Sequence, residues 1–205
     1  MRVLVPMTPS SFSNRGNISS FLAMDVMREV NMLQQTGQDI CHLEVGQPST
    51  RAPQVVLEAA RQALDSELIG YTDALGLDDL RQALSAYYLK TYKVEVSPDR
   101  FVITTGSSAG FILAFLACLD AGQQVAVTSP GYPSYITAIN ALDLTPLPIP
   151  LPNGNNWKLT ASNVHDAEKT HGGIDALLMA SPANPTGTML SKQALTDLSL
   201  DCAQA

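Results

Sequence analysis

The chain has 205 residues, and the hydrophobic share of 45% is typical of a globular protein. Twelve basic and 19 acidic residues give a net charge of −7, which argues against nucleic-acid or anionic-membrane binding because both need a basic face. The three cysteines include no CxxC pair, so the sequence predicts neither a zinc site nor a disulfide framework and favours a reducing, cytoplasmic setting.

The first hundred residues are predicted to be mainly helical. Residues 1–18 are rich in Ser, Thr, Pro and Asn and indicate an extended arm. Apolar residues at helical spacing then predict three helices. The helices are expected from Ser20 to Gly37, from Pro53 through Leu64, and from Leu77 through Tyr87, with a brief strand-like segment at 41–45.

From residue 101 onward, predicted strands alternate with predicted helices. Strands are expected at 101–105, 124–128, 144–151 and 175–180, a short extended piece at 157–160, and helices at 107–119, from Pro133, at 162–169 and from Ser191. Three prolines within 144–151 mark that strand as an edge or irregular strand. The alternation indicates an α/β fold with a mostly parallel sheet flanked by helices.

The stretch FVITTGSSAGFILAFLACL at 101–119 predicts a strand, a tight glycine turn and a helix start. This arrangement gathers free backbone N–H groups at Gly106, Ser107 and Ser108, and phosphate is the usual anion bound by such groups. The serine hydroxyls add further donors. A plain turn with a serine N-cap is the alternative interpretation.

Five motifs, taken in their order and spacing, resemble the class I/II aminotransferases, which are fold-type-I enzymes that use pyridoxal 5'-phosphate (PLP). The motifs are GQP at 46–48, YTDALGLDDLR at 71–81, TTGSSAGF at 104–111, SPGYPSY at 129–135 and SPANPTG at 181–187. The resemblance covers nearly the whole chain after the arm and implies a PLP-dependent transferase type I fold, truncated before the sheet is complete. It implies that residues 1–45 are the arm and a helix of the small domain, and that 46–205 form an incomplete large PLP-binding domain.

The resemblance also implies roles for individual residues in cofactor binding. It identifies Gly106, Ser107 and Ser108 as a cup for the cofactor phosphate. It places Tyr132 over the pyridine ring, where stacking would hold the ring flat. It assigns Asn184 to the ring hydroxyl oxygen. The alternatives are a loop tyrosine that packs on the sheet and a turn asparagine before proline.

Two further residues match residues at the edges of the family's active site. Tyr71 matches a tyrosine that reaches the cofactor phosphate of the neighbouring subunit, which implies a homodimer. Gly46 matches a glycine beside the substrate α-carboxylate. A loop tyrosine that caps the next helix and a simple turn glycine are the alternatives. The bonds Ser181–Pro182 and Asn184–Pro185 are both candidates for the cis form.

The family's lysine that forms the Schiff base lies beyond residue 205, so no catalytic residue is assigned within this chain. The expected function is the N-terminal part of an aminotransferase that moves an amino group between an amino acid and a 2-oxo acid, inactive as this fragment. The open alternatives are a PLP-dependent lyase or synthase of the same fold, a regulatory domain that senses PLP or an amino acid, and a non-functional truncated product. No metal, nucleic acid or membrane partner is expected.

Overall fold

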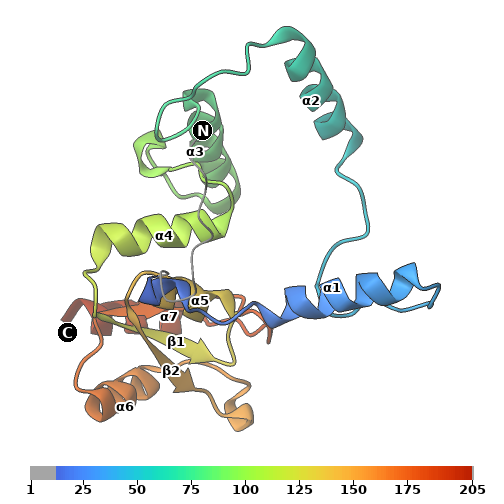
Figure 1. Cartoon of the computed structure of the whole chain (residues 1–205). Helices are drawn as coiled ribbons and strands as arrows, with labels where there is room; N and C mark the ends of the chain where they lie inside the picture. Colours follow the sequence, from blue (N-terminus) through green and yellow to red (C-terminus); the bar gives the residue numbers. More distant parts are fainter. Residues whose placement is uncertain (1–12, 205) are drawn as a thin grey trace, which may run out of the picture. The chain divides into compact units, whose positions relative to one another are not determined.

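The computed structural model of the chain describes residues 13–204 (Figure 1). Most of the predicted arm over 1–18 therefore lies outside the described residues. The described chain divides into two compact units. One unit consists of residues 26–109, and the other joins residues 13–25 to 110–204.

The unit of residues 26–109 is helical, as the periodicity predicted. Its helices are α1 (Leu22–Gln35, which starts in the other unit), α2 (Gln54–Ser66) and α3 (Asp78–Tyr92), followed by the short 3-10 helix η3 (Pro98–Arg100). Gly37 follows α1 at a φ of +88°. That left-handed conformation is a common end for a helix and is easily adopted by glycine.

Two strand predictions in this unit are wrong. Residues 41–45 and 101–105 are extended or bent but form no strand. A strand needs a neighbouring strand to pair with, and none lies beside either segment in the described part of the chain. The second segment is instead fixed to the loop before α3, because the Ile103 N–H donates to the Leu75 carbonyl at 3.0 Å.

The other unit contains a three-stranded parallel sheet in the order β2-β1-β3. Its strands are β1 (Gln124–Ser129), β2 (Thr145–Pro150) and β3 (Ala176–Leu178), so three of the four predicted strands are confirmed and β2 is the predicted edge strand. The helices α5 (Ser134–Ala141) and α6 (Ala161–His171) make the crossovers that parallel strands require. The remaining elements are α4 (Ser107–Cys118), α7 (Lys192–Gln204) and the short 3-10 helices η2 (Asn14–Gly16) and η4 (Asn153–Asn155).

The predicted extended piece at 157–160 is not a strand. Trp157 has a φ of +51°, and its N–H donates to the Pro152 carbonyl at 3.3 Å, so the segment belongs to a turn. This turn leads into the N-terminus of α6, where the Thr160 and Asn163 side chains accept hydrogen bonds from each other's backbone N–H groups. Such a capping box satisfies two backbone donors that the first helical turn leaves unpaired.

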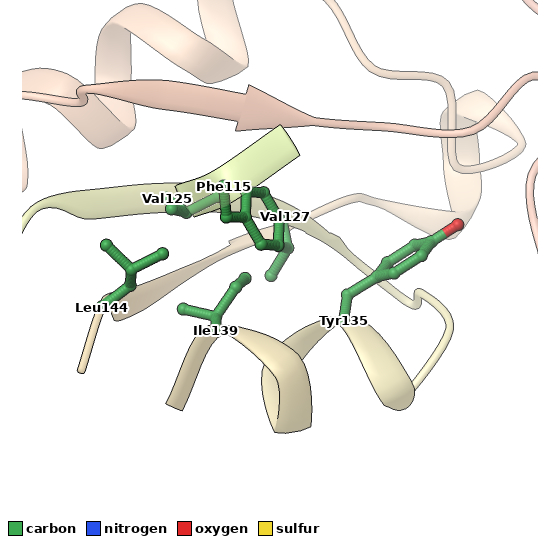
Figure 2. Packing of buried hydrophobic residues seen from close by; sticks show 6 residues of the cluster. All are labelled: Phe115, Val125, Val127, Tyr135, Ile139 and Leu144. Carbon is green, nitrogen blue, oxygen red and sulfur yellow. The ribbon is translucent and has the colours of Figure 1, made fainter. Parts of the chain in front are cut away.

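The core of this unit lies on both faces of β1. Val125 and Val127 contact α5 and α4 in one cluster, where Ile139 is fully buried (Figure 2). Ala126 points to the opposite face and packs in a second cluster with residues of β2, α6 and α7. The alternation follows from the two-residue period of a strand. The second cluster consists of Ala126, Ile149, Leu151, Leu159 and Leu198.

None of the helices among the described residues is long and apolar enough to cross a bilayer. In the same part of the chain, no cluster of three or more His, Cys, Asp or Glu side chains could hold a metal ion.

Candidate functional site

The segment at 104–108 forms the glycine turn and helix start that the sequence predicted. Gly106 has a φ of +83°, and a Cβ built on it would meet no atom within 4 Å, so the space beside the turn is open. Ser107 and Ser108 are the first two residues of α4 and are exposed, and no acidic residue lies in the first turn. The first N–H groups of a helix have no partner within it and carry partial positive charge. The segment can therefore accept an anion.

The turn itself is held by local hydrogen bonds. The Thr104 hydroxyl donates to the Gly106 carbonyl at 2.8 Å, and the Gly106 N–H donates to the Thr104 carbonyl at 2.8 Å. Both bonds join residues that precede the helix. Among the described residues, the backbone N–H groups and hydroxyls of Ser107 and Ser108 make no hydrogen bond outside the helix.

Tyr71 lies in the loop before α3, and this loop contacts residues 101–105, which precede the glycine turn at Gly106. The Tyr71 side chain is fully exposed. At the other end of its loop, Gly76 is buried at a φ of +96°, and a Cβ there would lie 2.5 Å from Ile103 Cγ1. The loop is braced internally, since the Leu75 N–H donates to Asp73 Oδ1 at 3.0 Å. The close approach at Gly76 thus ties the loop of Tyr71 to residues 101–105.

Gly46 lies in an exposed, irregular segment, and a Cβ built on it would meet nothing within 4 Å. Two residues earlier, Glu44 Oε1 lies 2.6 Å from His42 Nδ1. This hydrogen bond holds the pKa of the Glu44 carboxyl below its usual range. No hydrogen bond joins Gly46 or Tyr71 to residues 106–108 in the part of the chain that the structure describes.

Tyr132 belongs to the other unit and is half-buried in the loop just before α5. Its ring makes edge-to-face contacts with Phe21, at 6.0 Å between centroids, and with Tyr135, at 5.4 Å. It also packs against the core cluster around Val125. The edge-to-face geometry leaves the ring held by its neighbours at a defined angle.

Asn184 lies in the loop at 181–190, which is closed by backbone bonds. Ala183 N–H donates to the Thr188 carbonyl at 2.9 Å, and Gly187 N–H donates to the Ala183 carbonyl at 2.7 Å. The Asn184 side chain is exposed and makes no hydrogen bond within the described residues. The bonds Ser181–Pro182 and Asn184–Pro185 are cis, as the sequence suggested for either one.

The family model described as aminotransferase class I and II matches residues 38–204. The chain belongs to this family. The valine–pyruvate aminotransferase of Mycobacterium tuberculosis is 41% identical over 188 residues, which are 92% of this chain and 48% of that one. The aspartate aminotransferase of Thermotoga maritima is 31% identical over 175 residues, or 85% of this chain and 46% of that protein.

Solved aminotransferase structures share the fold. The crystal structure of an aminotransferase from Mycobacterium tuberculosis superimposes with a TM-score of 0.88 at 39% identity, over 94% of this chain and 49% of that chain. The aspartate aminotransferase of Thermus thermophilus with maleate gives 0.87 at 26% identity, over 94% and 50% of the two chains. This member of the family therefore spans about half the length of the relatives it matches. The predicted fold class, the PLP-dependent transferase type I fold with a mostly parallel sheet flanked by helices, is confirmed.

The residues of this chain suit a phosphate group at one place above all. The start of α4 offers backbone N–H groups, two exposed hydroxyls, open space at Gly106 and no nearby acid in its first turn. That donor set fits a phosphate dianion. The close approach of Gly76 to Ile103 was not predicted from the sequence. The glycine was visible in the motif YTDALGLDDLR, but its neighbour, 27 positions away (103 − 76), was not.

Proposed function

We propose that this chain forms the phosphate-binding half of a PLP-dependent aminotransferase that moves an amino group between an amino acid and a 2-oxo acid. The observation that carries the proposal is the start of α4, where Gly106 gives open backbone and Ser107 and Ser108 give exposed hydroxyls at a helix N-terminus. Bound PLP would supply an electron sink for the carbon that bears the amino group.

Each proposed site residue contributes one kind of contact. The N–H groups at the start of α4 and the hydroxyls of Ser107 and Ser108 hold the phosphate. Tyr132, whose ring angle is already set by Phe21 and Tyr135, stacks on the pyridine ring. The Asn184 amide donates to the ring hydroxyl oxygen, a role supported by its lack of any other hydrogen bond among the described residues.

Gly46 and Tyr71 are proposed for the edges of the site. The open backbone at Gly46 leaves room for the substrate carboxylate. The fully exposed Tyr71 ring is available to reach the phosphate of a second subunit, so we propose a homodimeric parent enzyme in the cytoplasm. Residues 1–45 are proposed to belong to the small domain and 46–205 to the large PLP-binding domain.

The proposed substrates are an amino acid and a 2-oxo acid. Relatives named for valine–pyruvate and aspartate transamination favour transamination over lyase or synthase chemistry. The lysine that the family uses to hold the cofactor aldehyde is not assigned to any residue here. We therefore propose that this chain binds PLP through its phosphate and does not catalyse transamination alone.

A titration of the chain with PLP tests the proposal. Absorbance in the near-ultraviolet and visible range follows binding, and borohydride is added at saturation to fix any bond between the aldehyde and a lysine. We expect saturable binding of PLP, weaker binding of pyridoxal without phosphate, competition by inorganic phosphate, and no covalent product. Each hydrogen bond to a charged group contributes about 1.5–3 kcal/mol, so Ser108→Ala should weaken PLP binding by about tenfold or more.

Ser162→Ala is the matched control, because Ser162 is the second residue of α6 as Ser108 is the second residue of α4. This control should bind PLP like the wild-type chain. Equal affinity for PLP and pyridoxal would overturn the assignment of the phosphate cup. A covalent product after borohydride, or transamination by the chain alone, would overturn the statement that the holding lysine lies outside it.

A further inference from the structure

The turn before α6 contains two consecutive residues in a left-handed conformation. Asn156 has a φ of +48°, and Trp157 has a φ of +51°. Asparagine tolerates this conformation, but it is unfavourable for a bulky side chain and persists only where the surrounding structure holds it. Residues held in this way are concentrated at functional sites. We therefore followed the contacts that the turn makes.

The turn is joined to the loop at 181–190. The Thr188 hydroxyl donates to the Asn156 carbonyl at 2.8 Å, although the two residues are 32 positions apart. Trp157 is half-buried and packs against the second core cluster. It also lines a cavity of about 10 Å³ together with Ala183 and Thr188 of the loop. This volume holds one water molecule at most, so the turn and the loop lie against each other and enclose no ligand site.

The loop has an inner side toward the turn and an outer, exposed side. The half-buried residues form the inner side, and they are Ser181, Ala183, Thr186, Thr188 and Leu190. All of them except Ser181 line the cavity beside Trp157. Asn184 lies on the exposed side. Contact with the turn thus fixes one side of the loop and leaves the Asn184 amide accessible on the other.

Few bonds fix the loop from outside. Its bonds from the Ala183 N–H to the Thr188 carbonyl and from the Gly187 N–H to the Ala183 carbonyl close the loop on itself. Between described residues, the bond to the Asn156 carbonyl is the one hydrogen bond that joins residues 182–189 to another part of the chain. The turn therefore sets how the loop is oriented.

We propose that Trp157 is a positioning residue for Asn184. Its side chain packs against the inner side of the loop, and its left-handed backbone places the Asn156 carbonyl where the Thr188 hydroxyl can reach it. Together these two contacts direct the Asn184 amide toward its ligand. The inference rests on the proposed function, in which that amide donates to the ring hydroxyl oxygen of PLP.

The bound cofactor reports the orientation of Asn184. A hydrogen bond donated to the ring hydroxyl oxygen stabilises its ionised form and so lowers the pKa of that hydroxyl. Absorbance of PLP bound to the chain, recorded against pH, measures this pKa. We expect Asn184→Ala to lower the acid dissociation constant about tenfold, because a hydrogen bond to a charged group is lost. Trp157→Ala should change it in the same direction, and Trp157→Phe, which keeps an aromatic ring, should restore most of the wild-type value.

A double variant separates positioning from a general structural role. If Trp157 acts through Asn184, Trp157→Ala changes the pKa of the bound hydroxyl no further once Asn184 is alanine. Ile149→Ala is the control for lost stability, because Ile149 belongs to the same core cluster but is not among the described residues that line the cavity. It should leave the pKa unchanged. Thr188→Val removes only the donor to the Asn156 carbonyl and should raise the pKa even if Trp157→Ala does not fold.

Amide hydrogen exchange follows the loop without any cofactor. The N–H groups of Ala183 and Gly187 are bonded within the loop, so their exchange reports its opening. Trp157→Ala and Thr188→Val should each accelerate exchange at both amides, by up to about tenfold for the single hydrogen bond that Thr188→Val removes.

The outcomes distinguish this inference from the proposed function. If Asn184→Ala changes the pKa but Trp157→Ala and Thr188→Val do not, the positioning role is overturned and the proposed function stands. The role is also overturned if Trp157→Ala has the same effect with and without Asn184, or if Ile149→Ala matches it. If PLP does not bind, the proposed function fails, and unchanged exchange at Ala183 in Thr188→Val then shows that the turn does not hold the loop.

Discussion

Replacement of Gly76 by alanine is predicted to loosen the contact between the Tyr71 loop and the segment that leads to the start of α4. Gly76 has a φ of +96°, and an added Cβ would lie 2.5 Å from Ile103 Cγ1 and 2.6 Å from Ile103 Cβ. Real Cβ atoms do not make contacts this short, and Ile103 Cβ cannot move without its backbone. The backbone of residues 75–76 or 103 must therefore shift.

The expected cost has two parts. A non-glycine residue in the left-handed region costs about 1–2 kcal/mol. Overpacking of a tight contact costs about 1–3 kcal/mol more. The sum is about 2–5 kcal/mol. Gly106→Ala is the matched control, because Gly106 has a φ of +83° but open space at its Cβ, so only the first part applies.

The assay is amide hydrogen exchange at Ile103, whose N–H donates to the Leu75 carbonyl across this contact. Each 1.4 kcal/mol corresponds to a tenfold change in exchange rate, so Gly76→Ala should accelerate exchange at Ile103 by at least about thirtyfold. The single tryptophan, Trp157, belongs to the other unit, and its fluorescence should not change. If exchange at Ile103 is no faster in Gly76→Ala than in Gly106→Ala, the steric argument fails.

Three smaller perturbations have equally direct readouts. Ile139→Ala removes a side chain that is 0% exposed, so it should lower the free energy of unfolding of its unit by about 2–5 kcal/mol. Trp157 fluorescence in urea measures this free energy, and a loss below about 1 kcal/mol would contradict the place of Ile139 in the core. Asp175→Ala removes the acceptor of the Gln124 N–H at 2.7 Å and should cost about 1 kcal/mol in the same assay, whereas Asp175→Asn should cost less. His42→Ala should raise the pKa of Glu44, followed by NMR titration. The pKa of Glu44 is lowered in the folded chain, so the hydrogen bond from His42 stabilises the folded state above the unfolded pKa of Glu44, and this stabilisation is lost as the pH falls through the folded pKa. An unchanged Glu44 titration in His42→Ala would contradict the pairing.

The helices could be predicted because local signals determine them. Apolar spacing placed α1, α2 and α3, and glycine and proline marked their ends. The strands of the sheet were predictable where each is followed by a crossover helix to its neighbour, as for 124–128 and 144–151. Residues 101–105 have the same β-branched composition as those strands, yet they form none. Composition indicates that a segment can be a strand, but a partner strand decides whether it is one.

The candidate site was predictable only in its parts. The glycine turn before α4 follows from local sequence, and the cis bonds in the loop of Asn184 follow from X–Pro pairs in a tight loop. The cis bond at Ser129–Pro130 was not anticipated. The approach of Gly76 to Ile103 joins residues far apart in the chain, and no periodicity of a single sequence encodes such a contact.

The distribution of buried side chains has a consequence for digestion by proteases. Every fully buried hydrophobic side chain among the described residues lies at position 115 or later, and residues 26–109 bury only the side chain of Arg81. Local opening costs least where few apolar contacts are lost, so the connections flanking α2 should be the first to fit into a protease active site. Brief trypsin treatment should therefore cleave first near Arg51 and leave a resistant fragment that contains the sheet.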